Sequence, residues 1–465
     1  MKNRLLMEVA RNRDRLLWIL KVACLISLVW LPFYLTFYPG VGMHDEISVS
    51  QSPKGSTNQP IMYGIFLGGF YKLGLKIFHD HLIGTGVAIL LLMVLMSIAI
   101  AYILWWLKDQ KVNQLLVILY GLYFTFTPII IDYAIAAVKD KAFGVVLMLL
   151  IPVTYNLAKQ RFREVSLKKM EWFFLLCIAM MWTRNNGGYI FIAFAGSILV
   201  FMQGNKKLFA KWAASVLLIG MAPSLIMGSN FTEGLGVPLQ QICRVVALDR
   251  ELPASDKRFI EQMKSIDKIK AQYDPRTVDA IKWTPGYNRQ FVDHHKKEFF
   301  KTWFSLMWLY PGDYFEAWRL NTQGFWGYLE GCEWQSKFGH SYEEEIYTTK
   351  KTKVGLADGF KVSALSVLPE NLKEKLGHYV WDYSTYIPSG VCLWLTILIG
   401  CVMIYKKQYE LLLVLAPAFF CSMTLILAAP IAKAFRYTFY YALCLPLFAI
   451  IPFLDNRDKA GAEKR

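Results

Sequence analysis

The chain has 465 residues, of which 55% are hydrophobic, 15% aromatic and only 18% charged, and its mean hydropathy is +0.32. So little charge argues against an ordinary soluble protein and predicts a polytopic membrane protein. The formal net charge is +16. Its basic residues lie in short clusters between apolar segments, as in cytoplasmic membrane loops, so we expect no nucleic-acid partner.

The N-terminal segment 1–15 is basic and leads directly into the apolar segment 16–37, with no small-residue cleavage site after it. We therefore interpret 16–37 as a retained first transmembrane helix. Segment 60–78 differs, because its apolar residues recur at helical spacing while Lys72 and Lys76 mark a polar side. This pattern predicts an amphipathic helix on the outer surface of the membrane, within the first outer loop.

The apolar segments predict an all-α fold with about ten transmembrane helices. Segment 170–203 has basic residues on both flanks, and the motif Thr183-Arg184-Asn185-Asn186-Gly187-Gly188 interrupts it. Since basic flanks mark the cytoplasm, we expect a hairpin of two short helices that turns on the outer side. The other predicted spans are 16–37, 82–107, 112–131, 142–158, 210–228, 387–405, 411–428 and 438–454. This topology predicts a multi-pass protein of the cell membrane with both termini in the cytoplasm.

Three regions follow from these segments. Residues 1–228 form an N-terminal membrane region with two outer loops, 229–386 an extracytoplasmic domain, and 387–465 a three-helix membrane region with a cytoplasmic tail. Strand patterns are scarce in 229–386, so we expect a mainly helical domain, with helices starting near Ser255 and Pro369. An aromatic helix at 299–308 is expected to rest on lipid headgroups. Cys243 and Cys332 are the only cysteines of this domain, which leaves a disulfide between them open.

The distribution of charge separates two kinds of function. Most predicted spans contain no Asp, Glu, His, Lys or Arg, whereas ion-coupled transporters keep such residues near the midplane. The notable charges gather at the predicted outer ends of the helices instead. They are Asp45, Glu46, Asp132, Lys139, Asp140, Lys141, Arg184, Lys433 and Arg436. A mixture of acids and bases at this depth suits a reaction at the membrane surface on a lipid-linked phosphate.

Several of these motifs resemble the GT-C superfamily, which contains polytopic glycosyltransferases that take sugars from polyprenyl-phosphate donors. The first outer loop reads Tyr38-Pro39-Gly40, then His44-Asp45-Glu46, then Gln59-Pro60-Ile61; the second reads Val138-Lys139-Asp140-Lys141-Ala142-Phe143. The motif around Arg184 and the sequence Ala434-Phe435-Arg436-Tyr437 are similar to outer-face motifs of uncharacterised bacterial members. Gln59 stands where the family has His, and a second Pro is missing. This departure allows an altered donor site or a different reaction.

The resemblance implies transfer of a sugar from a polyprenyl-phosphate donor to a glycan, lipid or protein acceptor, in the assembly of cell-envelope polysaccharide or a related glycan. Asp45 is the candidate general base, and its neighbour Glu46 is the alternative. Asp140 is expected to orient the acceptor, position the base or help to hold a divalent cation, which is the one candidate cofactor. Candidates for binding the donor phosphate are Lys139, Lys141, Arg184 and Arg436.

Each of these residues also has an ordinary structural interpretation. An acid in an outer loop can be a solvated side chain or a helix cap, and a basic residue at a helix end can extend to the membrane surface. Two other functions also fit the composition: a flippase or exporter of lipid-linked saccharides, and a non-catalytic subunit of an envelope-assembly complex.

Overall fold

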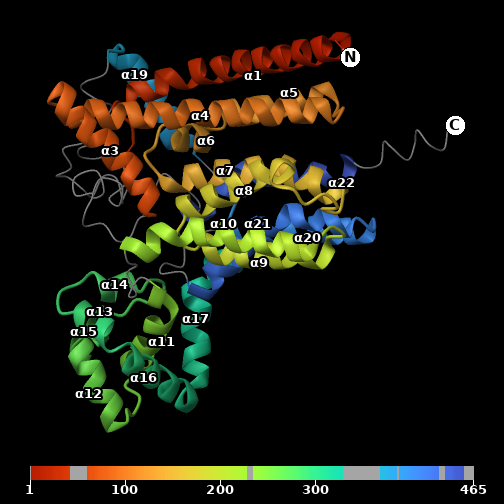
Figure 1. Cartoon of the computed structure of the whole chain (residues 1–465). Coiled ribbons are helices and arrows are strands. Elements are labelled where there is room, and N and C mark those ends of the chain that lie inside the picture. Colours follow the sequence, from red (N-terminus) through yellow and green to blue (C-terminus); the bar gives the residue numbers. More distant parts are fainter. Residues whose placement is uncertain are drawn as a thin grey trace.

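The structure is a computed structural model, which describes residues 2–41, 60–227, 234–327, 367–384, 387–428 and 435–454. These residues are nearly all helical. The only β features among them are two isolated bridges, Val41 to Ala136 and Asp274 to Thr277. The chain forms a bundle of long helices with a smaller helical domain beside one end (Figure 1). The predicted all-α class is confirmed.

One layer of the bundle is built around α4, which packs on α1, α3, α5 and α7. Helices α1, α4 and α5 run side by side, and α6 and α19 lie toward the end where α1 finishes (Figure 1). The helices of this layer are α1 (Lys2–Thr36), α3 (Ile61–Phe78), α4 (His81–Asp109), α5 (Gln114–Phe126), α6 (Pro128–Ala134) and α19 (Glu370–Tyr383).

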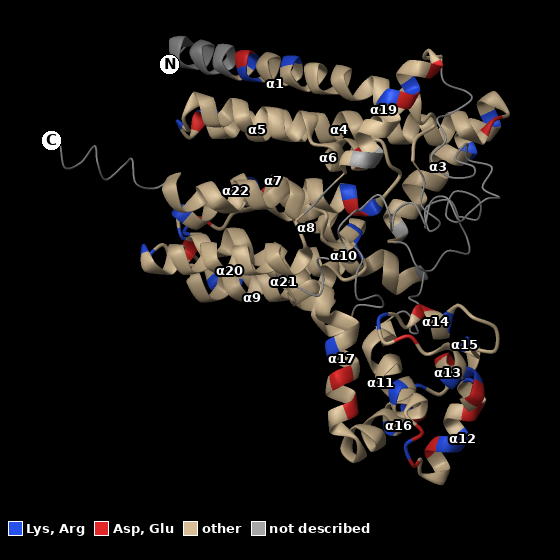
Figure 2. Cartoon of the chain, turned by 180° about the vertical axis from the view of Figure 1, so that it is seen from behind, with Lys and Arg blue, Asp and Glu red and all other residues tan. Residues whose placement is uncertain are grey.

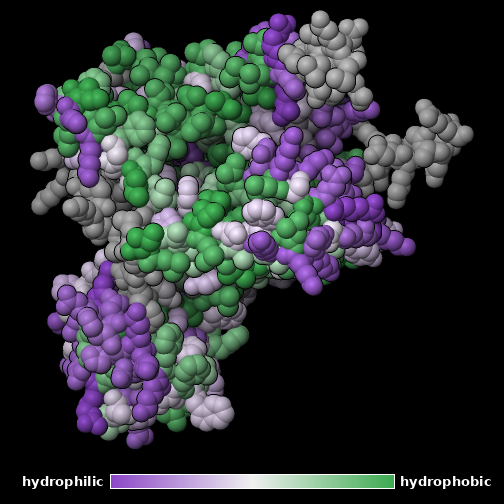
Figure 3. All heavy atoms as spheres, in the orientation of Figure 1, coloured by the Kyte–Doolittle hydropathy of each residue, from purple (hydrophilic) through white to green (hydrophobic). Residues whose placement is uncertain are grey.

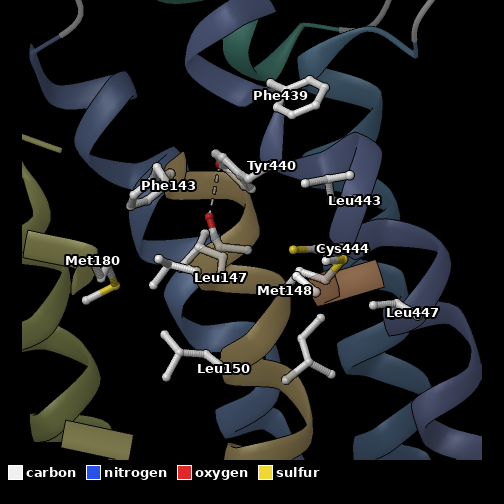
Figure 4. Close-up of a cluster of buried hydrophobic side chains, with 14 of the residues drawn as sticks. Phe143, Leu147, Met148, Leu150, Met180, Phe439, Tyr440, Leu443, Cys444 and Leu447 are labelled. Atoms are coloured by element: carbon white, nitrogen blue, oxygen red, sulfur yellow. Dashed lines mark hydrogen bonds between the residues drawn. The ribbon is translucent and has the colours of Figure 1, made fainter. Parts of the chain in front are cut away.

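The second layer is centred on α7, which packs on α8, α21 and α22 as well as on α4. Phe143 and Leu147 of α7 meet Tyr440 and Leu443 of α22 in a continuous apolar core, with Met180 of α8 on the other side (Figure 4). The helices of this layer are α7 (Lys139–Lys159), α8 (Leu167–Thr183), α9 (Gly187–Phe201), α10 (Lys206–Met227), α20 (Ser389–Tyr405), α21 (Leu412–Ala428) and α22 (Tyr440–Leu454), with 3-10 turns η2 (Tyr409–Leu411) and η3 (Phe435–Thr438).

Among the described residues, six helices are long and apolar enough to cross a membrane: Asn12–Thr36, His81–Asp109, Lys139–Lys159, Lys206–Ile226, Tyr409–Ala428 and Phe435–Leu454. The bent pair α5 and α6 is a seventh candidate, and α9 and α20 are apolar but shorter. Apolar side chains cover much of the bundle surface in Figure 3, as lipid contact requires. The chain is thus a membrane protein by composition and helix length. Several of the ten predicted spans are too short or too bent to qualify by length alone.

The span predicted at 112–131 is built from two helices instead of one. Asn113 caps α5 through its side-chain oxygen, which accepts a hydrogen bond from the Leu115 amide at 2.9 Å, but α5 ends at Phe126. A new helix, α6, begins at Pro128, and the two helices meet at an angle of 58°. Proline lacks an amide hydrogen and disfavours helical backbone at the preceding residue, here Thr127, so the break follows from the sequence.

The helix predicted at 60–78 is present as α3, which folds back on α4 through a two-residue turn. Its place on the outer surface of the membrane stays a prediction. His79 adopts a left-handed φ of 54°, and the Asp80 carboxylate caps α4 by accepting from the Leu82 amide at 2.8 Å. The two helices are in contact at Gly74 and Gly84. Their backbones are so close that a Cβ added to Gly74 would lie 2.6 Å from the Gly84 nitrogen. Only glycine permits this approach.

Seven helices, α11–α17, form the part of the chain described at 234–327, and they enclose a hydrophobic core of their own around Ile242, Ile260 and Phe299. The helix predicted from Ser255 is divided in two at Lys264 and Ser265. The seven are α11 (Gly236–Ala247), α12 (Ala254–Met263), α13 (Ile266–Gln272), α14 (Asp279–Lys282), α15 (Arg289–His294), α16 (Lys296–Leu309) and α17 (Pro311–Trp326).

Two other expectations for segment 229–386 concern its later part. The helix predicted to start at Pro369 is present as α19, and it packs on α1 and α6 of the bundle. Cys243 is buried, and it bonds no other cysteine within the described residues. Its suggested partner Cys332 lies outside the described residues, so the disulfide stays untested.

Candidate functional site

The two predicted outer loops meet beside the start of α7. The backbone of Val41 pairs with the segment just before α7, donating to the Ile135 carbonyl at 3.0 Å and accepting from the Ala137 amide at 2.8 Å. The first outer loop therefore leaves α1 next to the second. Asp45 and Glu46, the candidate bases, lie outside the described residues.

Lys141 holds the second loop in place. Its side chain is buried, and Nζ donates to the backbone carbonyls of Ala134 at 3.0 Å and Ala136 at 2.7 Å. A charged donor that satisfies two carbonyls at the end of α6 fixes the segment that pairs with Val41. The predicted role of Lys141 as a phosphate ligand is therefore disfavoured, because two of its three hydrogens already bond the backbone. Lys139 is also nearly buried, at the first turn of α7.

Lys141→Met should destabilise the fold by about 2–4 kcal/mol, because it leaves two buried carbonyls without their charged donor. The measurement is the free energy of unfolding in detergent. Lys211→Met is the matched control, since Lys211 is an exposed lysine on a candidate span, α10, and its replacement should change stability by less than about 0.5 kcal/mol. Equal stability of the two variants would show that Lys141 does not hold the loop.

Asp140 and Arg184 form a buried ion pair between the start of α7 and the end of α8. Arg184 Nη1 lies 3.4 Å from Asp140 Oδ1, and the two residues are only 6% and 3% exposed. The guanidinium also donates from Nη1 to the Tyr437 carbonyl at 2.8 Å and from Nε to Asn186 Oδ1 at 3.0 Å. Within the described residues, Asp140 Oδ2 is buried and accepts no hydrogen bond. A buried carboxylate oxygen without a donor is costly unless a ligand or another group satisfies it.

Arg436, on η3, lies near Arg184, because both guanidinium groups contact the ring of Tyr437. The centre of the Tyr437 ring lies 5.1 Å from the Arg436 guanidinium carbon and 5.8 Å from that of Arg184. Arg436 Nη2 also donates to the Tyr437 hydroxyl at 3.4 Å. Two guanidinium groups from distant parts of the chain thus contact one aromatic ring, which lets their charges approach each other.

Sequence reasoning missed the side chains that orient this cluster. Phe143 places its ring 4.9 Å from the Arg184 guanidinium, and the Asn186 amide donates to Thr424 of α21 at 2.5 Å. Ser422 joins the hydroxyls of Tyr440 and Tyr441 beneath the cluster, each at 2.8 Å. The signal was present for Asn186, Phe143 and Tyr437, because they stand inside the motifs that contain Arg184, Asp140 and Arg436. No pattern pointed to Ser422 or Thr424.

A divalent cation has no complete ligand set within the part of the chain that the structure describes. No three His, Cys, Asp or Glu residues gather there. Asp140 could supply one oxygen, and the acids of the first outer loop lie beyond the described ranges. A metal requirement therefore stays a prediction.

The comparisons with known proteins give one match. A family of unknown function (DUF6020) matches residues 51–465. No curated protein and no solved structure matches the chain. The match covers α3, the ion pair, the domain of α11–α17 and both arginines.

Proposed function

The chain belongs to this DUF6020 family, and because the family has no known function we propose one from the geometry. We propose an integral membrane glycosyltransferase of the GT-C type, which transfers a sugar from a polyprenyl-phosphate donor to an acceptor at the outer face of the cell membrane. One observation carries the proposal: the buried pair of Asp140 and Arg184 adjoins Arg436, at the end of the bundle where the first outer loop leaves α1.

The two arginines supply the positive charge that a lipid-linked phosphate needs. Within the described residues, Arg184 bonds protein groups through Nε and Nη1, which leaves Nη2 for a phosphate oxygen. Guanidinium groups bind phosphate in a fixed geometry and stabilise the charge that develops when the phosphate leaves. Among the described residues of this cluster, Asp140 is the acid that pairs with Arg184, and Arg436 adds a second positive charge, so these three residues are positive in sum.

The proposed reaction needs a base, and we assign that role to Asp45. Asp45 takes the proton of the acceptor hydroxyl as that oxygen bonds the anomeric carbon, and the bond from the anomeric carbon to the donor phosphate breaks. The polyprenyl phosphate leaves with the electron pair, beside the arginines. Asp45 is four residues beyond Val41, so the chain can carry its Cα at most about 14 Å from the Val41 Cα. Glu46 is the second candidate.

The proposal includes a topology with about ten spans, both termini in the cytoplasm and the domain of α11–α17 outside. In support, the first turns of α1 and the last turn of α22 lie at the same end of the bundle, away from that domain (Figure 1). Acidic and basic residues are nearly absent from the middle of the bundle helices and gather near their ends and on the outer domain (Figure 2). Uncharged middles favour a surface enzyme over an ion-coupled transporter.

A membrane-impermeant thiol reagent added outside should label Asp267→Cys of the outer domain but not Arg163→Cys, which follows α7. Both side chains are exposed, so accessibility to the reagent reports sidedness alone. An engineered cysteine near Ser56 should also be labelled from outside. Labelling of the unmodified chain measures the background from exposed Cys24 and Cys401. Labelling of Arg163→Cys in intact cells would overturn this topology and the outward-facing site with it.

The function itself is tested with purified protein in nanodiscs and in liposomes, offered polyprenyl-phosphate sugars with a panel of glycan, lipid and protein acceptors. We expect sugar transfer that requires donor and protein together. Movement of lipid-linked saccharide between leaflets without transfer would favour the flippase. A chain that does neither, yet is required in cells for envelope glycan, would be a non-catalytic assembly subunit.

A further inference from the structure

The turn between α16 and α17 presents large apolar side chains to the surroundings. Phe304, Trp308, Leu309 and Phe315 are exposed by 56, 85, 50 and 62%. We call these four residues the aromatic elbow. A tryptophan that is 85% exposed, next to three other exposed apolar side chains, indicates an interaction surface.

Hydrogen bonds fix the backbone of the aromatic elbow. Tyr310, between the two helices, donates from its hydroxyl to the Glu251 carbonyl at 2.6 Å. Arg250 binds Asp313 through two hydrogen bonds, of 2.8 and 3.3 Å, and Tyr314 donates to the Trp303 carbonyl at 2.9 Å. The backbone that carries the exposed side chains is therefore already ordered. Burying these side chains against a partner would not require the entropy cost of ordering the turn.

The second half of α17 is attached to the membrane bundle by two hydrogen bonds. Trp318 donates from its indole nitrogen to the Ile426 carbonyl of α21 at 2.9 Å, and Trp394 of α20 donates to the Trp326 carbonyl at 2.8 Å. From this attachment α17 runs crosswise to the bundle helices (Figure 1). Because it runs crosswise, α17 carries the aromatic elbow sideways from the bundle and keeps it close to the level of the helix ends.

The charge on α16 and the polarity of the domain indicate the partner. Lys297 and Lys301 are exposed and share a face of α16 with Phe304 and Trp308, at spacings of four, three and four residues. Figure 3 shows this domain hydrophilic on its left side and more apolar on its right, toward α17. Aromatic side chains beside lysines on one helix face suit the boundary between headgroups and acyl chains, where anionic lipids attract the lysines.

We propose that the aromatic elbow is a membrane anchor that seats the outer domain on the outer leaflet beside the bundle, with Trp308 and Phe315 among the acyl chains and Lys297 and Lys301 at the headgroups. The anchor does not depend on the proposed reaction. It gives the domain of α11–α17 a second hold on the bilayer, in addition to its attachment through α17.

The test places the photo-crosslinker p-benzoylphenylalanine at Trp308 or Phe315 of the full chain in nanodiscs of phosphatidylcholine and phosphatidylglycerol. Gln262 is the matched control position, because it is exposed on α12 at the other side of the domain. Irradiation should attach phospholipid at positions 308 and 315 at least about tenfold more than at 262, as side chains inserted in the interface require. Since all three positions are exposed, the variants should fold as the parent does.

Two results would overturn the proposal. Lipid labelling at 308 and 315 no higher than at 262 would show that the aromatic elbow stands in water. Crosslinks from both positions to a second copy of the chain, with lipid labelling at the control level, would make the aromatic elbow a contact between proteins. Replacing Lys297 and Lys301 together by Gln should lower labelling in the mixed nanodiscs and leave it unchanged in pure phosphatidylcholine. The same loss in both lipids would remove the headgroup role.

Discussion

Asp45→Asn should lower the rate of sugar transfer by about 10²- to 10⁴-fold, the usual contribution of a general base. The substitution nearly preserves volume and hydrogen-bonding shape but removes the oxygen charge that accepts the proton. Donor binding should survive, because the arginines that we propose to hold the phosphate are unchanged. The loss should therefore appear in kcat with little change in the Kd of the donor, measured by binding of the polyprenyl-phosphate sugar to the same preparation.

Glu46→Gln is the matched control, since it removes the neighbouring charge of the same loop. We expect it to retain transfer within about tenfold of the parent, because a neighbouring acid acts only through its field. The reverse pattern, an active Asp45→Asn beside an inactive Glu46→Gln, would move the base to Glu46. Full activity in both variants would end the claim for a base in this loop. A flippase has no general need for a base here, so inter-leaflet movement that is unaffected in both variants would point to that function.

The sequence predicted the helical class and most of the individual helices, because apolar runs and caps are local signals. The hairpin around Arg184 is a clear case: basic flanks and a polar break specified α8 and α9 without any knowledge of the fold. The number of spans was harder to predict. Length rules treat 112–131 as one helix, whereas Pro128 bends it by 58°, and tertiary packing decides whether such a bent pair still crosses the membrane.

The candidate site could be predicted in its members but not in their roles. Outer-end charge indicated Asp140, Lys141, Arg184 and Arg436 together, yet burial and pairing depend on contacts across more than 250 residues, such as Arg184 with Tyr437. Lys141 shows the limit most plainly. Its position among basic residues resembled a phosphate ligand, whereas the structure turns its ammonium group inward onto two carbonyls. A sequence pattern gives no direction for a long side chain.

Variants of Asp140 and Arg184 should show the largest change in stability, and comparing the single variants with the double variant separates that change from an effect on function. Arg184→Gln leaves a buried carboxylate without its counter-charge, and Asp140→Asn leaves a buried guanidinium; each should cost about 3–5 kcal/mol of unfolding free energy. The double variant removes both charges, so we expect it to be more stable than the sum of the single losses predicts, by about 2–3 kcal/mol. The measurement is the free energy of unfolding of the four proteins in one detergent.

Donor binding should behave differently from stability in the same four proteins. If Arg184 binds the donor phosphate, the double variant recovers stability but stays deficient in donor binding, because no guanidinium has been restored. Arg184→Lys should also bind donor more weakly, by roughly 10- to 100-fold. An ammonium keeps the charge but offers all its hydrogens from one nitrogen, whereas Arg184 bonds Asp140 and Tyr437 through Nη1 and can offer Nη2 to a phosphate. A double variant that regains donor binding together with stability would make this pair a structural contact. The phosphate site would then have to be built from Arg436 and the first outer loop.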